Sequence, residues 1–135
     1  MNVIYELNSQ HIEELHTLYQ GEWWTKGRTL NETQLCVNGS QICIGLIDKN
    51  GALQAFARVV TDYIFKAFIF DVIVAEQCRK QGLGDKLIDL IKGHKNLESV
   101  KSFELYCLPE LEGFYSNHHF TNDVGGITLM RCLNI

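Results

Sequence analysis

The residues best suited to bind a charged ligand lie together in the segment 79–84, whose sequence is Arg-Lys-Gln-Gly-Leu-Gly. The segment follows an apolar run and precedes leucines at helical spacing, so it predicts a turn from a buried strand into a helix. Gly82 and Gly84 carry no Cβ, which lets an anion approach the main chain, and the helix N-terminus adds partial positive charge. These features predict a diphosphate site formed by Arg79, Lys80, Gln81, Gly82, Leu83 and Gly84.

Two common nucleotide-binding loops do not fit this segment. The dinucleotide fingerprint requires a third glycine where Leu87 stands, and the nucleoside-triphosphate loop requires the sequence Gly-Lys-Ser/Thr. Two glycines two residues apart are a weak signal on their own, so a plain turn that only starts a helix is the structural alternative.

A single carboxylate interrupts the apolar run before this loop. Asp71 stands within Phe-Ile-Phe-Asp-Val-Ile-Val, residues 68–74, and burial there would raise its pKa toward a value useful for a general base. Strand alternation would place Asp71 on the face of Ile69 and Ile73, opposite Phe70. The alternative is a buried structural aspartate bound to Arg58 or to a backbone N–H.

The order of strand-like and helix-like segments predicts a layered α+β domain. Strand spacing covers residues 2–7, 41–48, 53–61, 67–75 and 103–107, and a closing hairpin is predicted at 120–123 and 127–133. Helical spacing covers residues 10–20, 30–37, 82–93 and 109–117, and Ser9 is the predicted cap of the first helix. Short turns at 38–39 and 49–51 favour an antiparallel meander.

Composition limits the class of protein. A length of 135 residues with 46% apolar residues predicts a single domain spanning residues 1–135. The net charge of −4, without a run of Lys or Arg, disfavours a nucleic-acid partner. The five cysteines are never closely paired, so no metal is predicted. The absence of a long apolar stretch and of a signal-peptide pattern predicts a cytoplasmic protein without a membrane partner.

The loop and its surroundings resemble the GNAT superfamily of N-acetyltransferases. Val74 followed by the segment 79–84 is similar to the family's Arg/Gln-x-x-Gly-x-Gly/Ala signature, and the order of elements matches from the first strand through Phe120. The resemblance implies a GNAT-like α+β fold with a mixed, mostly antiparallel twisted sheet flanked by helices on both faces. It also implies direct transfer of an acetyl group from acetyl-CoA to a primary amine of a small molecule or peptide.

The same resemblance implies how the donor would be bound. Main-chain groups of Val72, Ile73 and Val74 would pair with the pantetheine arm, and the loop 79–84 would hold the pyrophosphate. The thioester would lie where the strand 67–75 splays away from the strand 103–107, and the backbone N–H of Val74 or a neighbour would polarise its carbonyl group.

Acyl transfer to an amine also needs an acid and a base. Tyr115 matches the position where family members often carry a tyrosine that protonates the sulfur of the coenzyme, and packing against the pantetheine is its structural alternative. Asp71 is the first candidate base, with Glu104 or a water molecule as the other choices.

The residues Trp23, Trp24 and Arg28 lie where the family places its variable acceptor-binding region. Two aromatic rings suit an apolar or cationic group and a guanidinium suits a carboxylate, so Trp24 and Arg28 are the predicted substrate residues. Packing of the tryptophans in a local core is the alternative.

Two other functions stay open at this point. A non-catalytic acyl-CoA-binding or sensing module would keep the loop but lack a competent acid or acceptor pocket. A thiol-dependent hydrolase using Cys107 or Cys78 ranks lower, because neither cysteine has a convincing histidine partner. Dimerisation is common among such folds, so a homodimer stays open as well.

Overall fold

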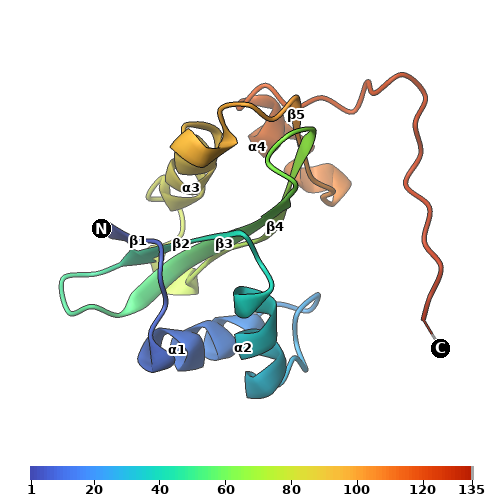
Figure 1. Ribbon diagram of the computed structural model, residues 1–135. Coiled ribbons are helices and arrows are strands. Elements are labelled where there is room, and N and C mark those ends of the chain that lie inside the picture. The colour runs from blue at the N-terminus through green and yellow to red at the C-terminus, as the bar shows by residue number, and fades with distance from the viewer. Residues whose placement is uncertain (135) are drawn as a thin grey trace. The chain divides into compact units, whose positions relative to one another are not determined.

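The computed structural model describes residues 1–134. The chain divides into two compact units, Met1–Leu105 and Tyr106–Ile135. The first unit contains the sheet and the long helices, and the second contains short helical turns (Figure 1). That residues 1–135 form one domain stays a prediction.

A five-stranded sheet organises the first unit. The strands lie in chain order as β1 (Asn2–Ile4), β2 (Ile42–Ile47), β3 (Leu53–Thr61), β4 (Lys66–Val74) and β5 (Ser102–Glu104). The pairs from β1 to β4 are antiparallel, and β4 pairs with β5 in parallel. The predicted meander is therefore confirmed, and β1 and β5 are shorter than the apolar segments that predicted them.

Helices cover both faces of this sheet. Helices α1 (Ser9–Gln20) and α2 (Leu30–Asn38) lie on one face, and α3 (Leu83–Lys92) lies on the other (Figure 1). The cap of α1 is Asn8 rather than Ser9: its side chain accepts from the backbone N–H of His11, and the side chain of His11 in turn accepts from the N–H of Asn8. The prediction of Ser9 was wrong by one residue because both types can cap a helix.

The core on the α1 side is built from residues that share nearly complete burial: Leu15, Tyr19, Cys43, Leu53, Phe56 and Ile73. On the other face, α3 buries Leu83, Leu87, Ile88 and Ile91, as its helical spacing predicts. Burying apolar surface contributes a favourable free energy of about 25 cal/mol per Å², and this contribution stabilises both helical layers against the sheet. Short turns of 3-10 helix at Glu76–Cys78 and Lys95–Leu97 complete this unit.

The second unit contains a 3-10 turn at Pro109–Leu111 and the short helix α4 (Glu112–Ser116). The predicted closing hairpin was wrong, because residues 120–134 form neither strand nor helix. An apolar segment has strand propensity, but a strand also needs a paired backbone, and local sequence does not specify that partner.

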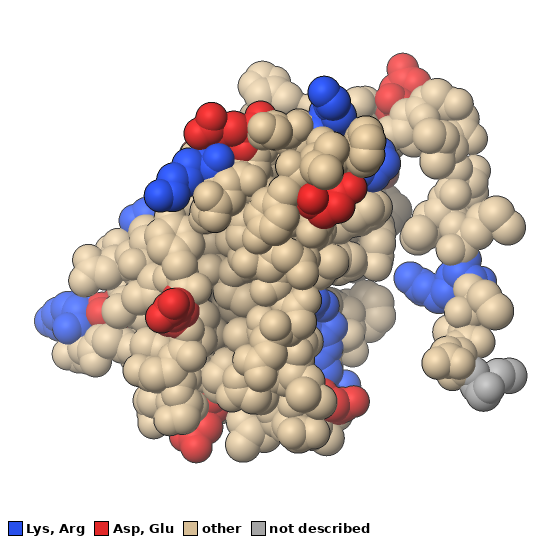
Figure 2. Space-filling model, in the orientation of Figure 1, with Lys and Arg blue, Asp and Glu red and all other residues tan. Residues whose placement is uncertain are grey.

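Charged side chains of both signs are interspersed on the face seen in Figure 2. Among residues 1–134, no helix is both long enough and apolar enough to cross a membrane.

Candidate active site

Toward its carboxyl end, β4 is no longer paired with β5. β4 pairs with β5 only from Lys66 to Phe68, and β5 ends at Glu104. Residues 71–74 of β4 therefore have no strand partner on that side within residues 1–134. Unpaired backbone groups in an extended segment are suited to pair with an extended ligand that carries amides. Val72, Ile73 and Val74, the predicted pantetheine contacts, lie in this part of the strand.

A bulge interrupts β4 where this unpaired part of the strand begins. Phe56 of β3 faces Ile73, whereas Arg58 faces Phe70, so β4 holds one more residue than β3 between the two pairs. Asp71 lies at this extra position. Its backbone φ is 56°, in the left-handed region that Asp tolerates better than most residues. The bulge thus fits the residue type found there.

The bulge also changes which side chains share a face. Arg58 bonds Asp71 and stacks over the ring of Phe70, with 5.0 Å from its guanidinium carbon to the ring centroid. Phe70 and Asp71 therefore lie on the same side of the sheet, and the prediction that they are opposed was wrong. Strict alternation assumes a regular ladder, and the extra residue breaks it.

Asp71 is the centre of a buried polar cluster. Its side chain is 5% exposed, and Oδ2 accepts from Arg28 Nη1 at 2.7 Å, from Arg58 Nε at 2.7 Å and from the Tyr19 hydroxyl at 2.9 Å. Arg28 Nη2 adds a longer contact of 3.3 Å to Oδ1. These partners come from α1, from the loop between α1 and α2, and from β3, so one carboxylate ties three elements to the bulge.

The cluster determines the protonation state of Asp71. Burial would raise the pKa of Asp71, but hydrogen bonds from Arg28 and Arg58 and the charges of both guanidinium groups outweigh burial and hold it below its usual value. Burial, followed by the charge of Asp71, raises the pKa of Tyr19 and keeps that hydroxyl protonated as a donor. A carboxylate with a lowered pKa and three close donors is poorly suited to accept a proton, which favours the structural alternative for Asp71.

The predicted diphosphate loop has the geometry that exposes backbone amides. Lys80 and Gly82 have φ values of 64° and 77°, and Gly82 is the N-cap of α3. Unlike α1 and α2, which start with capping boxes, α3 starts at a glycine and has no side-chain hydrogen bond from its N-cap. A helix start without a side-chain cap is suited to bind an anion, because backbone N–H groups at the start of a helix need an acceptor.

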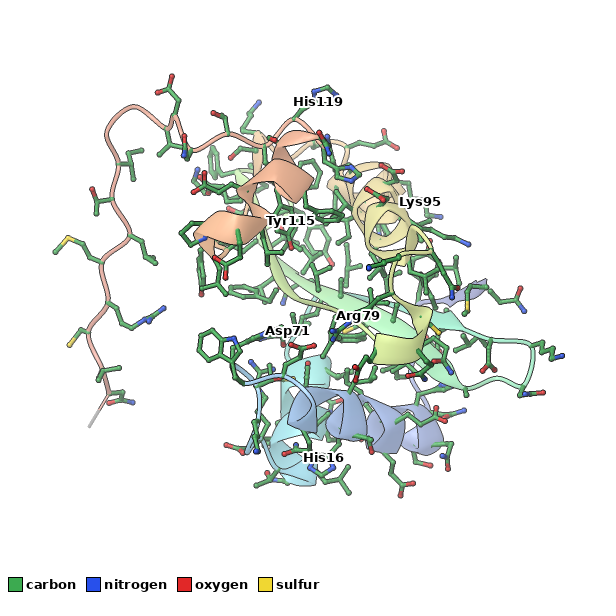
Figure 3. All side chains as sticks on the ribbon, turned by 180° about the vertical axis from the view of Figure 1, so that it is seen from behind. His16, Asp71, Arg79, Lys95, Tyr115 and His119 are labelled. Atoms are coloured by element: carbon green, nitrogen blue, oxygen red, sulfur yellow. The ribbon has the colours of Figure 1, made fainter. Side chains whose placement is uncertain are left out.

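Arg79, the first residue of this loop, lies between two elements. Its Nη2 forms an ion pair with the carboxylate of Glu22, and its Nε donates to the backbone oxygen of Val74 at 3.3 Å. Figure 3 shows Arg79 and Asp71 in the region between β4 and the layer of α1 and α2. Glu22 was not among the residues that the sequence pointed to, because it lies far from Arg79 along the chain.

The loop between α1 and α2 carries the predicted acceptor residues. Trp23 is 73% exposed and Trp24 is 40% exposed, so neither ring belongs to a core. The next residue, Thr25, is buried and its hydroxyl donates to the backbone oxygen of Tyr19 at 2.7 Å. Arg28 is held by Asp71, and its carbon Cζ lies 4.5 Å from the centroid of the Tyr19 ring. The exposed rings therefore sit on a loop with anchored ends.

The second base candidate is less fully paired than Asp71. Glu104 on β5 bonds Lys66 Nζ through Oε1 at 2.9 Å, and its buried Oε2 has no hydrogen-bond partner among the described residues.

Tyr115, the predicted acid, lies on α4 of the second unit and packs there in an aromatic cluster. The centroid of its ring is 4.9 Å from that of Phe114 and 5.9 Å from that of Phe120. Burial, with the Cys107 sulfur as a smaller cause, raises the pKa of Tyr115 to about 12, which keeps its hydroxyl protonated at neutral pH. Burial and Glu112 likewise raise the pKa of the Cys107 thiol, which disfavours it as a nucleophile.

The mixed sheet, the opening beside β4 and the uncapped loop define a protein of the acyl-CoA N-acyltransferase fold. Residues 9–120 match the model of the Acetyltransferase (GNAT) family, and the chain belongs to this family. The recognition and the fold predicted from the sequence are thus confirmed.

Individual relatives agree with this assignment. The chain is similar to a protein of Porphyra purpurea named uncharacterized N-acetyltransferase ycf52, with 32% identity over 92% of this chain and 74% of that protein. It is also similar to a crystal structure of a GNAT-family acetyltransferase from Xanthomonas campestris pv. campestris. That likeness has a TM-score of 0.84 and 29% identity and covers 98% of this chain and 92% of the other.

A more distant structure carries the coenzyme. An aminoglycoside 6'-N-acetyltransferase complexed with coenzyme A has a TM-score of 0.66 and 14% identity over 78% of this chain and 61% of that one. At this identity the likeness shows the shared fold alone.

Proposed function

We propose that the chain is an N-acetyltransferase that moves an acetyl group from acetyl-CoA directly to a primary amine of a small molecule or peptide. The observation that carries the proposal is the continuous run from the open edge of β4 into the uncapped start of α3. An acyl-CoA needs both parts, because its pantetheine arm carries amides and its diphosphate carries negative charge.

In the proposed complex, main-chain groups of Val72, Ile73 and Val74 pair with the pantetheine amides. The loop holds the diphosphate at the positions Arg79, Lys80, Gln81, Gly82, Leu83 and Gly84. Arg79 contributes its side chain, because its backbone N–H donates to the Glu76 oxygen at 3.3 Å, and the residues after it contribute backbone N–H groups. The left-handed φ of Gly82 is the backbone feature that supports this role. No metal is needed for these steps, because backbone dipoles and cations neutralise the charge.

The proposed reaction is one displacement in a ternary complex. The unprotonated amine attacks the thioester carbonyl carbon, the carbon–sulfur bond breaks, and the thiolate takes a proton. Tyr115 supplies that proton in the proposal, because its hydroxyl is protonated at neutral pH. The contacts of Asp71 disfavour it as the base. Glu104, through the Oε2 that has no hydrogen-bond partner within residues 1–134, or water takes the amine proton instead.

The proposed acceptor site lies at the exposed part of the loop between α1 and α2. Trp24 offers a half-exposed ring for an apolar or cationic group. Arg28 contributes by keeping the loop attached to Asp71, and its side chain, 29% exposed, retains surface for an acceptor carboxylate. A cytoplasmic location and a homodimer stay predictions.

Calorimetric titration with acetyl-CoA tests the donor site. Gly82→Asp is compared with Gly82→Asn, because both residues tolerate positive φ but only Asp places a negative charge beside the diphosphate. We expect binding by the wild type, a modest loss in the Asn variant and at least about a tenfold further loss in the Asp variant, the equivalent of roughly 1.4 kcal/mol. A wild type that gives no binding heat overturns the proposal.

Tyr115→Phe tests the acid. We expect acetyl-CoA affinity close to wild type and a loss of thiol release of about 10²–10⁴-fold with a panel of amines, the range of general acid catalysis. Unchanged turnover would assign Tyr115 to packing and the proton to water.

A further inference from the structure

The ion pair between Glu22 and Arg79 joins two loops that are distant in sequence. Glu22 lies two residues after the end of α1, in the loop that carries Trp23 and Trp24. Arg79 opens the loop that leads into α3. The Glu22 side chain is 23% exposed and that of Arg79 is 50% exposed, so the pair lies at the surface of the first unit.

The Arg79 guanidinium cannot pair fully with Glu22, in the loop between α1 and α2, and with a bound diphosphate at the same time. Its guanidinium is aimed at Glu22 by Nη2 and held to the end of β4 by the 3.3 Å bond from Nε to the Val74 oxygen. A half-exposed ion pair contributes only about 0–1 kcal/mol. A diphosphate presents more negative charge than one carboxylate and binds a guanidinium in a bidentate manner, so it is the stronger partner.

We propose that Glu22 is a positioning residue that couples the loop between α1 and α2 to occupancy of the donor site through Arg79. In the empty protein Glu22 holds this loop to Arg79. When coenzyme A binds, its diphosphate takes the Arg79 guanidinium, and Glu22 and the tryptophans beside it are released. The inference rests on the proposed function.

Thermodynamic linkage predicts how removing the Glu22 carboxylate changes the affinity for coenzyme A. If the pair has to break for coenzyme A to bind, its loss must favour binding by the same factor. We therefore expect Glu22→Gln to bind coenzyme A about two- to fivefold more tightly than the wild type. A residue with a purely structural role in this loop would leave affinity unchanged or weaken it.

The chain carries its own probe, because its two tryptophans directly follow Glu22. Coenzyme A is titrated into the wild type and Glu22→Gln, and tryptophan emission is followed with excitation beyond the absorption of adenine. Affinity is measured in parallel by calorimetry. Glu13→Gln is the matched control, because Glu13 is an exposed residue of α1 with the same charge and no ion pair with Arg79.

We expect a saturable change of emission in the wild type and in the Glu13 variant. The Glu22 variant should start near the emission of the bound wild type, change little on titration and bind more tightly. The same emission change in the Glu22 variant, or unchanged or weaker affinity, overturns the coupling while the donor site stands. Absence of binding heat in the wild type overturns the proposed function and the inference with it.

Discussion

Replacing Asp71 removes the one acceptor shared by three donors at the β4 bulge. In Asp71→Ala, the side chains of Arg28 and Arg58 lose their ion-pair partner while they are only 29% and 16% exposed. Breaking a buried ion pair from one side costs about 3–5 kcal/mol, and the exposure of Arg28 favours the lower end, about 3 kcal/mol. Alanine at a φ of 56° adds about 1 kcal/mol of backbone strain.

Urea unfolding measures this loss. With a slope of about 1–3 kcal/mol per M, a total of about 4 kcal/mol moves the midpoint down by about 1–4 M. Asp71→Asn is the matched control, because Asn keeps an oxygen acceptor and tolerates the left-handed backbone but carries no charge. We expect it to lose about 1–3 kcal/mol, less than the alanine variant.

Measurements of activity distinguish a positioning role of Asp71 from a role as general base. If Asp71 positions the bulge, folded Asp71→Asn keeps turnover within about tenfold of the wild type and has the same pH profile, whereas loss of a general base costs about 10²–10⁴-fold and moves the profile. A double-mutant cycle with Arg58→Met should give coupling of about 1–3 kcal/mol. Additive losses, or an alanine variant as stable as the wild type, would refute the account of the cluster.

Three further outcomes are expected. Gly45→Ala should lose about 1–3 kcal/mol in urea unfolding, because its Cβ would lie 2.9 Å from side-chain carbons of Ile4 and Leu53; a neutral change would mean that both side chains relax freely. Asn8→Ala should lose about 1 kcal/mol by the same assay through the cap of α1, and an equal loss in Ser9→Ala would contradict the cap seen here. Because the pKa of Asp71 is lowered on folding, its stabilisation is complete above the unfolded pKa of about 4 and is lost as the pH falls toward the folded value. Acid titration of Asp71→Asn should therefore show a shallower loss of stability over that range than the wild type.

Regular elements were predictable from the sequence because their causes are local. The buried face of α3 follows from leucine spacing, and the β2–β3 turn follows from Asn50 and Gly51. The loop before α3 was also placed correctly, since a strand, a left-handed glycine and a helix start are all encoded within a few neighbouring residues. The segment 127–133 failed for the opposite reason, because strand formation depends on a partner that the segment itself does not encode.

The candidate site depends on local sequence and also on contacts between residues that are far apart in the chain. A lone aspartate in an apolar strand predicts burial, but the sign of its pKa shift depends on partners 13, 43 and 52 residues away. Periodicity does not encode these separations, and Glu22 lies 57 residues from Arg79 for the same reason.

The bulge shows how these long-range contacts serve the proposed reaction. A regular β4 would keep its alternation through Asp71 and direct that carboxylate away from Arg58. The extra residue instead turns Asp71 toward Arg58 and Arg28, and their charges compensate for burying it. The same irregularity lies where β4 has parted from β5 and continues toward α3. The carboxylate that first suggested a base is therefore better explained as the group that fixes the shape of the strand on which the proposed donor would lie.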